Sequence, residues 1–109
     1  MRRTLVRSLL WVLAAAATNA VAADPKPAGH QVVIEGVQYA PQEIRAKVGE
    51  VIVWINHDPF PHTVTATGKQ FDSHDIAAGG SWKYTATKAG VFEYACMYHP
   101  TMKGTVRVE

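Results

Sequence analysis

The chain has 109 residues, of which 48% are hydrophobic and 18% charged, and its formal net charge at pH 7 is +2. No stretch gathers the basic residues into the clustered face that nucleic-acid binding needs, so that class of function is excluded. The single cysteine cannot form an internal disulfide, so a metal ion is the expected additional source of stability for so small a domain.

The N-terminus has the three-part pattern of a secretory signal peptide. Three arginines within the first seven residues precede the apolar run 9–17, and Ala20-Val21-Ala22 fits the small-x-small cleavage pattern. The run is shorter than the roughly 20 residues that span a bilayer. We predict a signal peptide at 1–22, cleaved after about Ala22, and a periplasmic protein without a membrane span. The pattern leaves the choice between general and twin-arginine export open.

The remaining chain is predicted to be one small domain. Residues 23–30 are rich in Pro, Ala and Gly and predict a flexible lead-in, and the folded domain is expected at 31–109. Three of the eleven basic residues and none of the nine acidic residues lie in 1–22, so the exported chain carries a formal charge of −1. A free thiol in an oxidising compartment is reactive unless something occupies it, which again favours a metal.

Short β-strands are expected throughout this domain. Runs rich in Val, Ile, Thr and aromatic residues alternate with Gly- and Pro-containing turns, and no segment has sustained helical spacing. The expected strands are 31–37, 43–48, 51–56, 62–67, 81–87, 91–96 and 104–108. Seven to eight such strands predict an all-β fold, an antiparallel Greek-key sandwich or barrel.

Alternation along these strands predicts which side chains point inward. His62, Cys96 and Met102 each fall in the inward phase of a different strand, whereas Thr63 and Thr65 fall in the outward phase. Three potential metal ligands are therefore expected to point into one sandwich.

The segment "CMYHPTM" at 96–102 carries Cys96, His99 and Met102 at steps of three. Together with His62 they offer two imidazoles, a thiolate and a thioether, the ligand set of a blue-copper site. A lone buried Cys or Met is more often a packing residue. The combination in one exported single-cysteine domain predicts a mononuclear copper site.

The stretches "WIN", "HTV" and "YACMYHPTMKGTVRVE" resemble the small cupredoxins, the type 1 blue copper proteins that include plastocyanin, pseudoazurin and amicyanin. The short Cys-x2-His-x2-Met loop is amicyanin-like. The resemblance implies one type 1 copper, with His62, Cys96 and His99 as strong in-plane ligands and Met102 as the weak axial ligand. It also implies that Asn56 ties the His-bearing loop to the Cys-bearing loop by hydrogen bonds.

The chain departs from the family pattern between Cys96 and His99. Relatives commonly have Thr-Pro or Ser-Pro there, and this chain has Met97-Tyr98. Met97 is a formal rival to Met102 as a ligand, but the neighbour of Cys96 in an extended chain points away from the metal.

The leading functional hypothesis is a one-electron carrier that cycles between Cu(II) and Cu(I) and is not an enzyme. It would dock transiently with a redox donor and acceptor, as a monomer, through an apolar patch around His99. The residues expected to form this patch are Pro59, Phe60, Tyr98 and Pro100. An inward position of Phe60 and Tyr98, shielding the metal from water, stays open.

The alternative function is copper storage, delivery or tolerance in the periplasm. Three histidines outside the predicted site, His30, His57 and His74, motivate this alternative, although surface histidines without a ligand role are common. A copper oxidase or nitrite reductase is excluded because no second complete ligand set is present.

Overall fold

The computed structural model describes residues 12, 15 and 29–109. Apart from those two single positions, the expected signal peptide lies outside the described residues, and so does 23–28 of the expected lead-in. The described part of the chain contains no helix that is long and apolar enough to cross a membrane.

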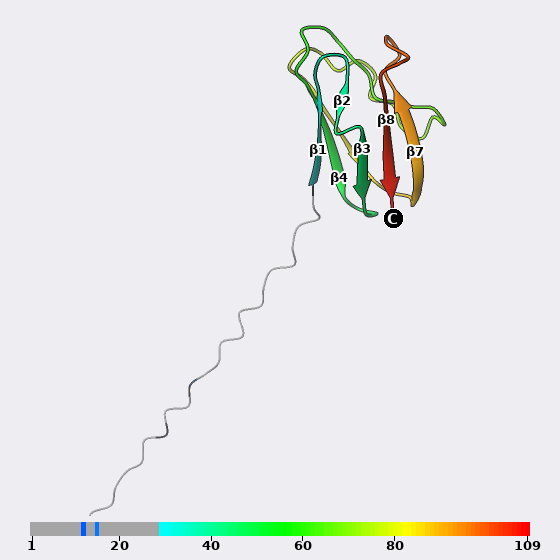
Figure 1. Cartoon of the computed structure of the whole chain (residues 1–109). Helices are drawn as coiled ribbons and strands as arrows, with labels where there is room; N and C mark the ends of the chain where they lie inside the picture. Colours follow the sequence, from blue (N-terminus) through cyan, green and yellow to red (C-terminus); the bar gives the residue numbers. More distant parts are fainter. Residues whose placement is uncertain (1–11, 13–14, 16–28) are drawn as a thin grey trace, which may run out of the picture.

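Within 29–109, eight strands form two four-stranded sheets that face each other as a sandwich (Figure 1). One sheet has the order β2-β1-β4-β6 and the other the order β3-β8-β7-β5. The strands are β1 (Gly29–Ile34), β2 (Tyr39–Ala40), β3 (Glu43–Ala46), β4 (Val51–Asn56), β5 (Thr65–Ala66), β6 (Ser81–Thr85), β7 (Gly90–Ala95) and β8 (Lys103–Val108). The predicted all-β sandwich is confirmed.

The pairing within the sheets is mixed. Strands β1 and β4 pair in parallel, as do β3 and β8, whereas the other four neighbouring pairs among the described strands are antiparallel. The chain enters the second sheet at β3 and returns to the first at β4, so β1 and β4 run in the same direction. Parallel neighbours need such a crossover connection, which local alternation of residues does not encode.

Two expected strand boundaries differ most from the structure. Strand β1 begins at Gly29, so Gly29 and His30 belong to the first strand rather than to the lead-in. The expected strand 62–67 is reduced to β5, and His62 makes only an isolated bridge with Ile76. The N–H group of Thr63 donates a hydrogen bond to Cys96 Sγ at 3.3 Å and not to a neighbouring strand. The ladder of hydrogen bonds between strands is therefore interrupted at Thr63.

Inward-facing side chains of both sheets form one core around Trp54. The Trp54 Nε1–H group donates a hydrogen bond to the hydroxyl of Tyr94 at 3.2 Å, and the rings of Tyr39 and Tyr94 meet edge to face at 4.7 Å. Burying a large apolar side chain contributes about 1.5–3 kcal/mol. The two sheets are thereby held at a fixed spacing beneath the site.

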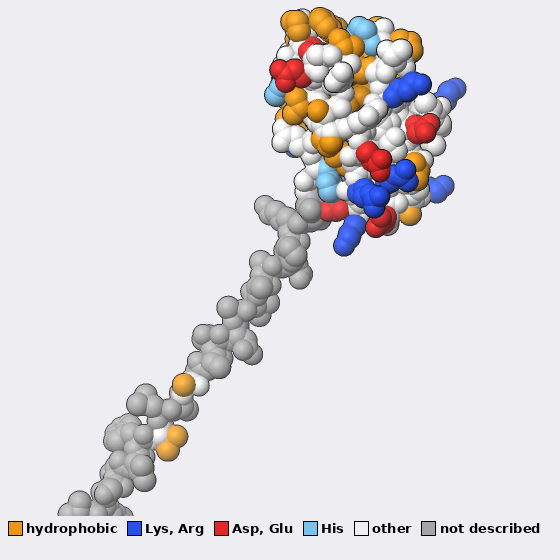
Figure 2. Space-filling model, in the orientation of Figure 1, with side chains coloured by type: hydrophobic (Ala, Val, Ile, Leu, Met, Phe, Trp, Pro, Cys, Tyr) orange, Lys and Arg blue, Asp and Glu red, His pale blue; other side chains and the backbone are white. Residues whose placement is uncertain are grey.

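The loop after β4 and the loop between β7 and β8 lie at the end of the sandwich opposite the C-terminus (Figure 1). Figure 2 shows hydrophobic side chains gathered at this end beside a histidine, whereas the visible Lys and Arg side chains lie along the side and toward the other end. The predicted ligands are carried by these two loops, because His62 follows β4 and 96–102 connects β7 to β8.

Candidate metal centre

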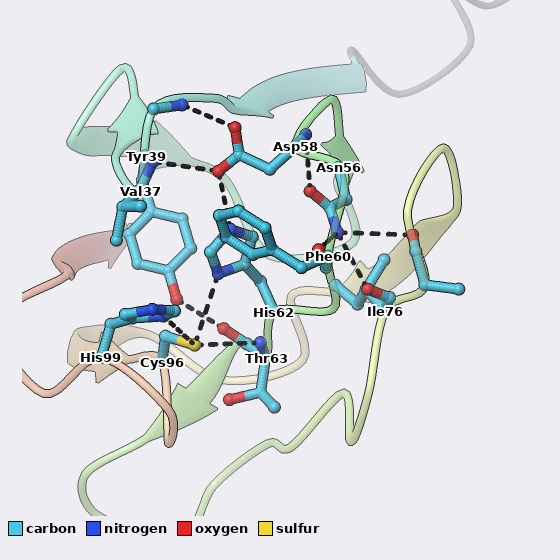
Figure 3. A network of polar contacts seen from close by, with 12 residues as sticks. Val37, Tyr39, Asn56, Asp58, Phe60, His62, Thr63, Ile76, Cys96 and His99 are labelled. Atoms are coloured by element: carbon cyan, nitrogen blue, oxygen red, sulfur yellow. Dashed lines mark hydrogen bonds and ion pairs between the residues drawn. The ribbon is translucent and has the colours of Figure 1, made fainter.

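His62, Cys96 and His99 come together at this end of the sandwich. One donor atom from each lies within 4.8 Å of the others. Cys96 Sγ is 3.7 Å from Nδ1 of His62 and 3.9 Å from Nδ1 of His99 (Figure 3). His62 and Cys96 are buried, His99 is partly exposed, and Met102 is buried with 3% of its surface accessible. The structure therefore gathers three of the four predicted ligands and buries the fourth.

The loop 96–102 is folded by its own backbone. The N–H of His99 donates to the carbonyl of Cys96 at 3.3 Å, and the N–H of Met102 donates to the carbonyl of His99 at 2.9 Å. The N–H of Cys96 donates to the carbonyl of Met102 at 3.2 Å and closes the loop. Each turn spans three residues, which explains why Cys96, His99 and Met102 are spaced three apart. Met97 is 68% exposed, in accord with its rejection as a ligand.

Thr63 connects the two ligand-bearing loops. Its N–H donates to Cys96 Sγ at 3.3 Å, and its Oγ1 accepts a hydrogen bond from the N–H of Met97 at 2.9 Å. A donor on the sulfur stabilises the thiolate form of the cysteine. The predicted outward orientation of Thr63 is wrong, because only 2% of the residue is exposed. Strand alternation fails at this position because the ladder is interrupted there.

Asp58 holds His62 from the side remote from Cys96. Its Oδ2 lies 2.7 Å from Nε2 of His62, and its carboxylate accepts hydrogen bonds from the N–H groups of Gly36 at 2.7 Å and Val37 at 2.9 Å (Figure 3). An ionised carboxylate can only accept, so Nε2 carries the proton and the lone pair of Nδ1 points toward Cys96.

The pKa of Asp58 reflects this environment. Burial by itself raises the pKa, but hydrogen bonds from Val37 and Gly36, together with His62, outweigh it and lower the pKa below its usual value. The carboxyl is therefore ionised at neutral pH. Sequence analysis missed Asp58. Its position four residues before His62 was the available sequence pattern, and the backbone N–H groups that bind its carboxylate lie in the β1–β2 turn, far away in the chain.

The hydrogen bonds of Asn56 differ from those that the resemblance implies. Its side-chain amide donates to the carbonyls of Phe60 at 2.9 Å and Ile76 at 3.0 Å, and its Oδ1 accepts from the N–H of Asp58 at 3.0 Å. Within 29–109, none of its hydrogen bonds reaches the loop 96–102. Asn56 therefore shapes the His-bearing loop and ties it to the segment before β6, and Thr63 makes the link to the cysteine loop.

The donor set fits a metal ion. A first-row metal with bonds of about 2.0 Å to nitrogen and 2.3 Å to sulfur, at angles near 120°, would place sulfur and nitrogen about 3.7 Å apart. The observed distances of 3.7 and 3.9 Å match this value. Two imidazoles and one thiolate suit copper in both of its common oxidation states. The residues present can therefore hold the copper that the sequence predicts.

An apolar surface surrounds the exposed part of His99. A shallow hollow is lined by Phe60, Pro61, Tyr98 and His99. Phe60 is 40% and Tyr98 54% exposed, so neither residue is packed fully inward over the site. The other two expected patch residues, Pro59 and Pro100, are exposed but do not line the hollow.

The three remaining histidines are not part of the His62–Cys96–His99 cluster. Each is near a different acid: His30 is 3.3 Å from Glu50, His57 is 3.9 Å from Glu35, and His74 is 3.9 Å from Asp72. No second group of three His, Cys, Asp or Glu side chains with ligand spacing occurs among the described residues.

The two-sheet sandwich and the His-Cys-His cluster at its end define a small metal-binding protein of the blue-copper class. Residues 5–108 match the family of the cupredoxin-like domain, and the chain belongs to this family. Cupredoxins hold one type 1 copper, for which His62, Cys96 and His99 form a possible site. The predicted family membership and cofactor are confirmed.

The chain is similar to amicyanins in both sequence and structure. It is 36% identical over 96 residues to amicyanin from Paracoccus versutus, an alignment that covers 82% of this chain and 72% of the relative. Plastocyanin from Scenedesmus fuscus is 29% identical over 84 residues, covering 65% and 86% of the two chains. An amicyanin variant solved in its oxidised state superposes with a TM-score of 0.70 at 31% identity, covering 74% of this chain and 82% of that one. The relatives are electron carriers and not enzymes, so this chain is a cupredoxin electron carrier.

Proposed function

We propose that this protein is a periplasmic electron carrier in which His62, Cys96 and His99, together with Met102, would hold one copper ion. The observation that supports this proposal most directly is that one donor atom from each of His62, Cys96 and His99 lies within 4.8 Å of the others, at one end of the sandwich. Bound copper would supply a one-electron Cu(II)/Cu(I) couple.

The protein's part is to hold these ligands in nearly the same place in both oxidation states. Asp58 fixes the imidazole of His62, and the N–H of Thr63 stabilises the negative charge on the sulfur of Cys96. The ligand loop is closed by its own backbone hydrogen bonds. Little rearrangement then accompanies the arrival or departure of an electron.

Electron exchange would occur through the partly exposed edge of His99. The surrounding docking patch is apolar, with Pro59, Phe60, Tyr98 and Pro100 exposed on it. A small apolar contact of this kind supports brief encounters with a redox donor and acceptor. The protein would act as a monomer, since such encounters need only one copy.

The site is tested by visible absorption and electron paramagnetic resonance spectra of the Cu(II)-loaded protein beside its Cys96→Ala variant. We expect an intense thiolate-to-copper band and a narrow copper hyperfine splitting, both lost in the variant. His74→Ala is the matched control, because His74 is exposed and is not part of the cluster, and it should keep both signals. A pale spectrum that is identical in the protein and in Cys96→Ala would overturn the ligand assignment.

Two measurements distinguish electron transfer from copper handling: the rate of electron self-exchange and the rate of Cu(I) release to a competing chelator. An electron carrier should show fast electron self-exchange and should retain Cu(I) against the chelator. Rapid release of Cu(I) with slow self-exchange would instead support copper storage or delivery. Copper storage or delivery gains no support from a second copper site, because among the described residues no second ligand group includes His30, His57 or His74.

The periplasmic location is supported by the signal-peptide pattern of the sequence. Cell fractionation followed by mass measurement should find the protein in the periplasm without residues 1–22. Recovery of the uncleaved chain from the cytoplasm would contradict this part of the proposal.

A further inference from the structure

The hydroxyl of Tyr98 donates a hydrogen bond to Oδ1 of Asp75. Tyr98 lies between Cys96 and His99, at the position where the sequence departs from the usual proline, and Asp75 lies in the segment between β5 and β6. Within 29–109 this is the one side-chain hydrogen bond that joins the loop 97–102 to that segment. It crosses the exposed surface of the site rather than its buried side.

The segment that carries Asp75 is firmly attached to the other ligand-bearing loop. The next residue, Ile76, exchanges two backbone hydrogen bonds with His62, at 2.7 and 3.2 Å. The carbonyl of Ile76 also accepts a hydrogen bond from the buried amide of Asn56 at 3.0 Å. Asp75 is therefore a well-anchored acceptor beside the site.

The two histidines of the cluster are held differently. His62 is buried and bonded to Asp58, whereas among the described contacts His99 has no carboxylate or carbonyl partner for its second ring nitrogen. The ring of His99 lies 6.1 Å from that of Phe60 and 5.2 Å from that of His62, both centroid distances. Its position therefore depends on the loop backbone to which Tyr98 belongs.

We infer that Tyr98 and Asp75 form a positioning pair that holds the ligand loop against the segment beside His62 and thereby keeps His99 at the metal. This inference deepens the proposed function and rests on the proposed ligand role of His99. The pair ties the loop to the anchored segment beside His62, a restraint that the proline of the usual pattern would supply by stiffening the backbone instead. Its importance is greatest for Cu(I), which prefers soft sulfur and holds an imidazole less firmly than Cu(II) does.

The pair also shapes the docking patch. Tyr98 lines the hollow around His99 together with Phe60 and Pro61. The hydrogen bond to Asp75 restricts the ring to one orientation, so this part of the hollow is formed before a partner arrives.

The test compares Tyr98→Phe and Asp75→Ala with the copper-loaded wild-type protein. The measurements are the rate of Cu(I) transfer to a competing chelator and the mobility of the His99 ring by nuclear magnetic resonance in the reduced state. We expect each variant to release Cu(I) about fivefold faster, the factor that corresponds to loss of a hydrogen bond worth about 1 kcal/mol. The double variant should be no faster than either single variant, because both remove the same bond.

Asp75→Asn and Tyr84→Phe complete the design. The amide oxygen of Asp75→Asn still accepts a hydrogen bond, so its release rate should return toward that of the wild type. Tyr84→Phe removes a hydroxyl from β6, away from the ligand loop, and should leave the rate unchanged. Unchanged release and His99 mobility in both Tyr98→Phe and Asp75→Ala would overturn the inference while a retained thiolate band upholds the copper site. Absence of that band in the wild type would overturn the proposed function itself.

Discussion

The carboxylate of Asp58 and the imidazole of His62 form a buried pair at 2.7 Å that fixes which ring nitrogen of the histidine is free. Because Asp58 is itself held by the N–H groups of Gly36 and Val37, the β1–β2 turn and the candidate copper ligand are parts of one hydrogen-bonded unit. Removal of the carboxylate should therefore affect the metal directly.

Asp58→Ala should weaken copper binding about 10- to 100-fold, because the ring of His62 loses the acceptor that sets its tautomer and orientation. The reduction potential should rise, since a less basic imidazole stabilises Cu(II) less. Chelator competition and protein-film voltammetry measure the two effects. Glu43→Ala is the matched control, because Glu43 is an exposed acid on β3 that pairs with Arg107 and makes no contact with Asp58 or His62 among the described contacts. Equal affinities of the two variants would contradict a role for Asp58 at the site.

Thr63→Val should lower the free energy of unfolding of the metal-free protein by about 1 kcal/mol, because the N–H of Met97 loses its acceptor. The hydrogen bond to Cys96 Sγ comes from the backbone of Thr63 and remains. The copper spectrum should therefore change little. Urea unfolding measures the stability loss, and Thr67→Val is the control because its hydroxyl bond to Glu93 is exposed and remote from the site. A spectrum as strongly altered as that of Cys96→Ala would contradict this division of roles.

Gly104→Ala should destabilise the fold by about 1–3 kcal/mol. A Cβ atom at Gly104 would lie 2.3 Å from Cζ and the hydroxyl oxygen of Tyr94, a buried ring that cannot move without disturbing Trp54. Thermal unfolding measures the loss. Gly29→Ala is the matched control, because nothing lies within 4 Å of a Cβ atom there. Equal melting temperatures of the two variants would show that the Tyr94 ring is not confined as described.

Stability should fall at alkaline pH as the buried tyrosines are forced to ionise. Burial raises the pKa of Tyr94 from 10.0 to about 12, and it raises that of Tyr39 as well. The neutral phenols stabilise the fold fully below pH 10, where both states are protonated, and this contribution is lost as the pH rises from 10 toward 12.

Urea unfolding at a series of pH values, read beside the phenolate absorbance, tests this expectation. Tyr94→Phe should flatten the dependence on pH in that window, although it lowers stability at neutral pH by leaving Trp54 Nε1 without its acceptor. A wild-type free energy of unfolding that stays constant up to pH 12 would contradict the proposed burial of the phenols.

The sequence by itself determined the fold class and the residues to examine as ligands. Alternation along the expected strands correctly placed Cys96 and Met102 inside the sandwich, because the period of a regular strand is local. The spacing of three in 96–102 is also local, since successive turns of the loop generate it. These features need no knowledge of the remaining chain.

Only the tertiary structure decided what surrounds the ligands. Thr63 is buried and bridges two loops, Asn56 binds the segment at Ile76 rather than the cysteine loop, and Asp58 is anchored by a turn far away in sequence. Hydrogen bonds of this kind join residues whose separation along the chain carries no periodic signal. The parallel pairing of β1 with β4 depends likewise on a crossover between sheets. Ligand identity is a property of residue type and spacing, whereas ligand orientation depends on contacts that exist only after the sheets have packed.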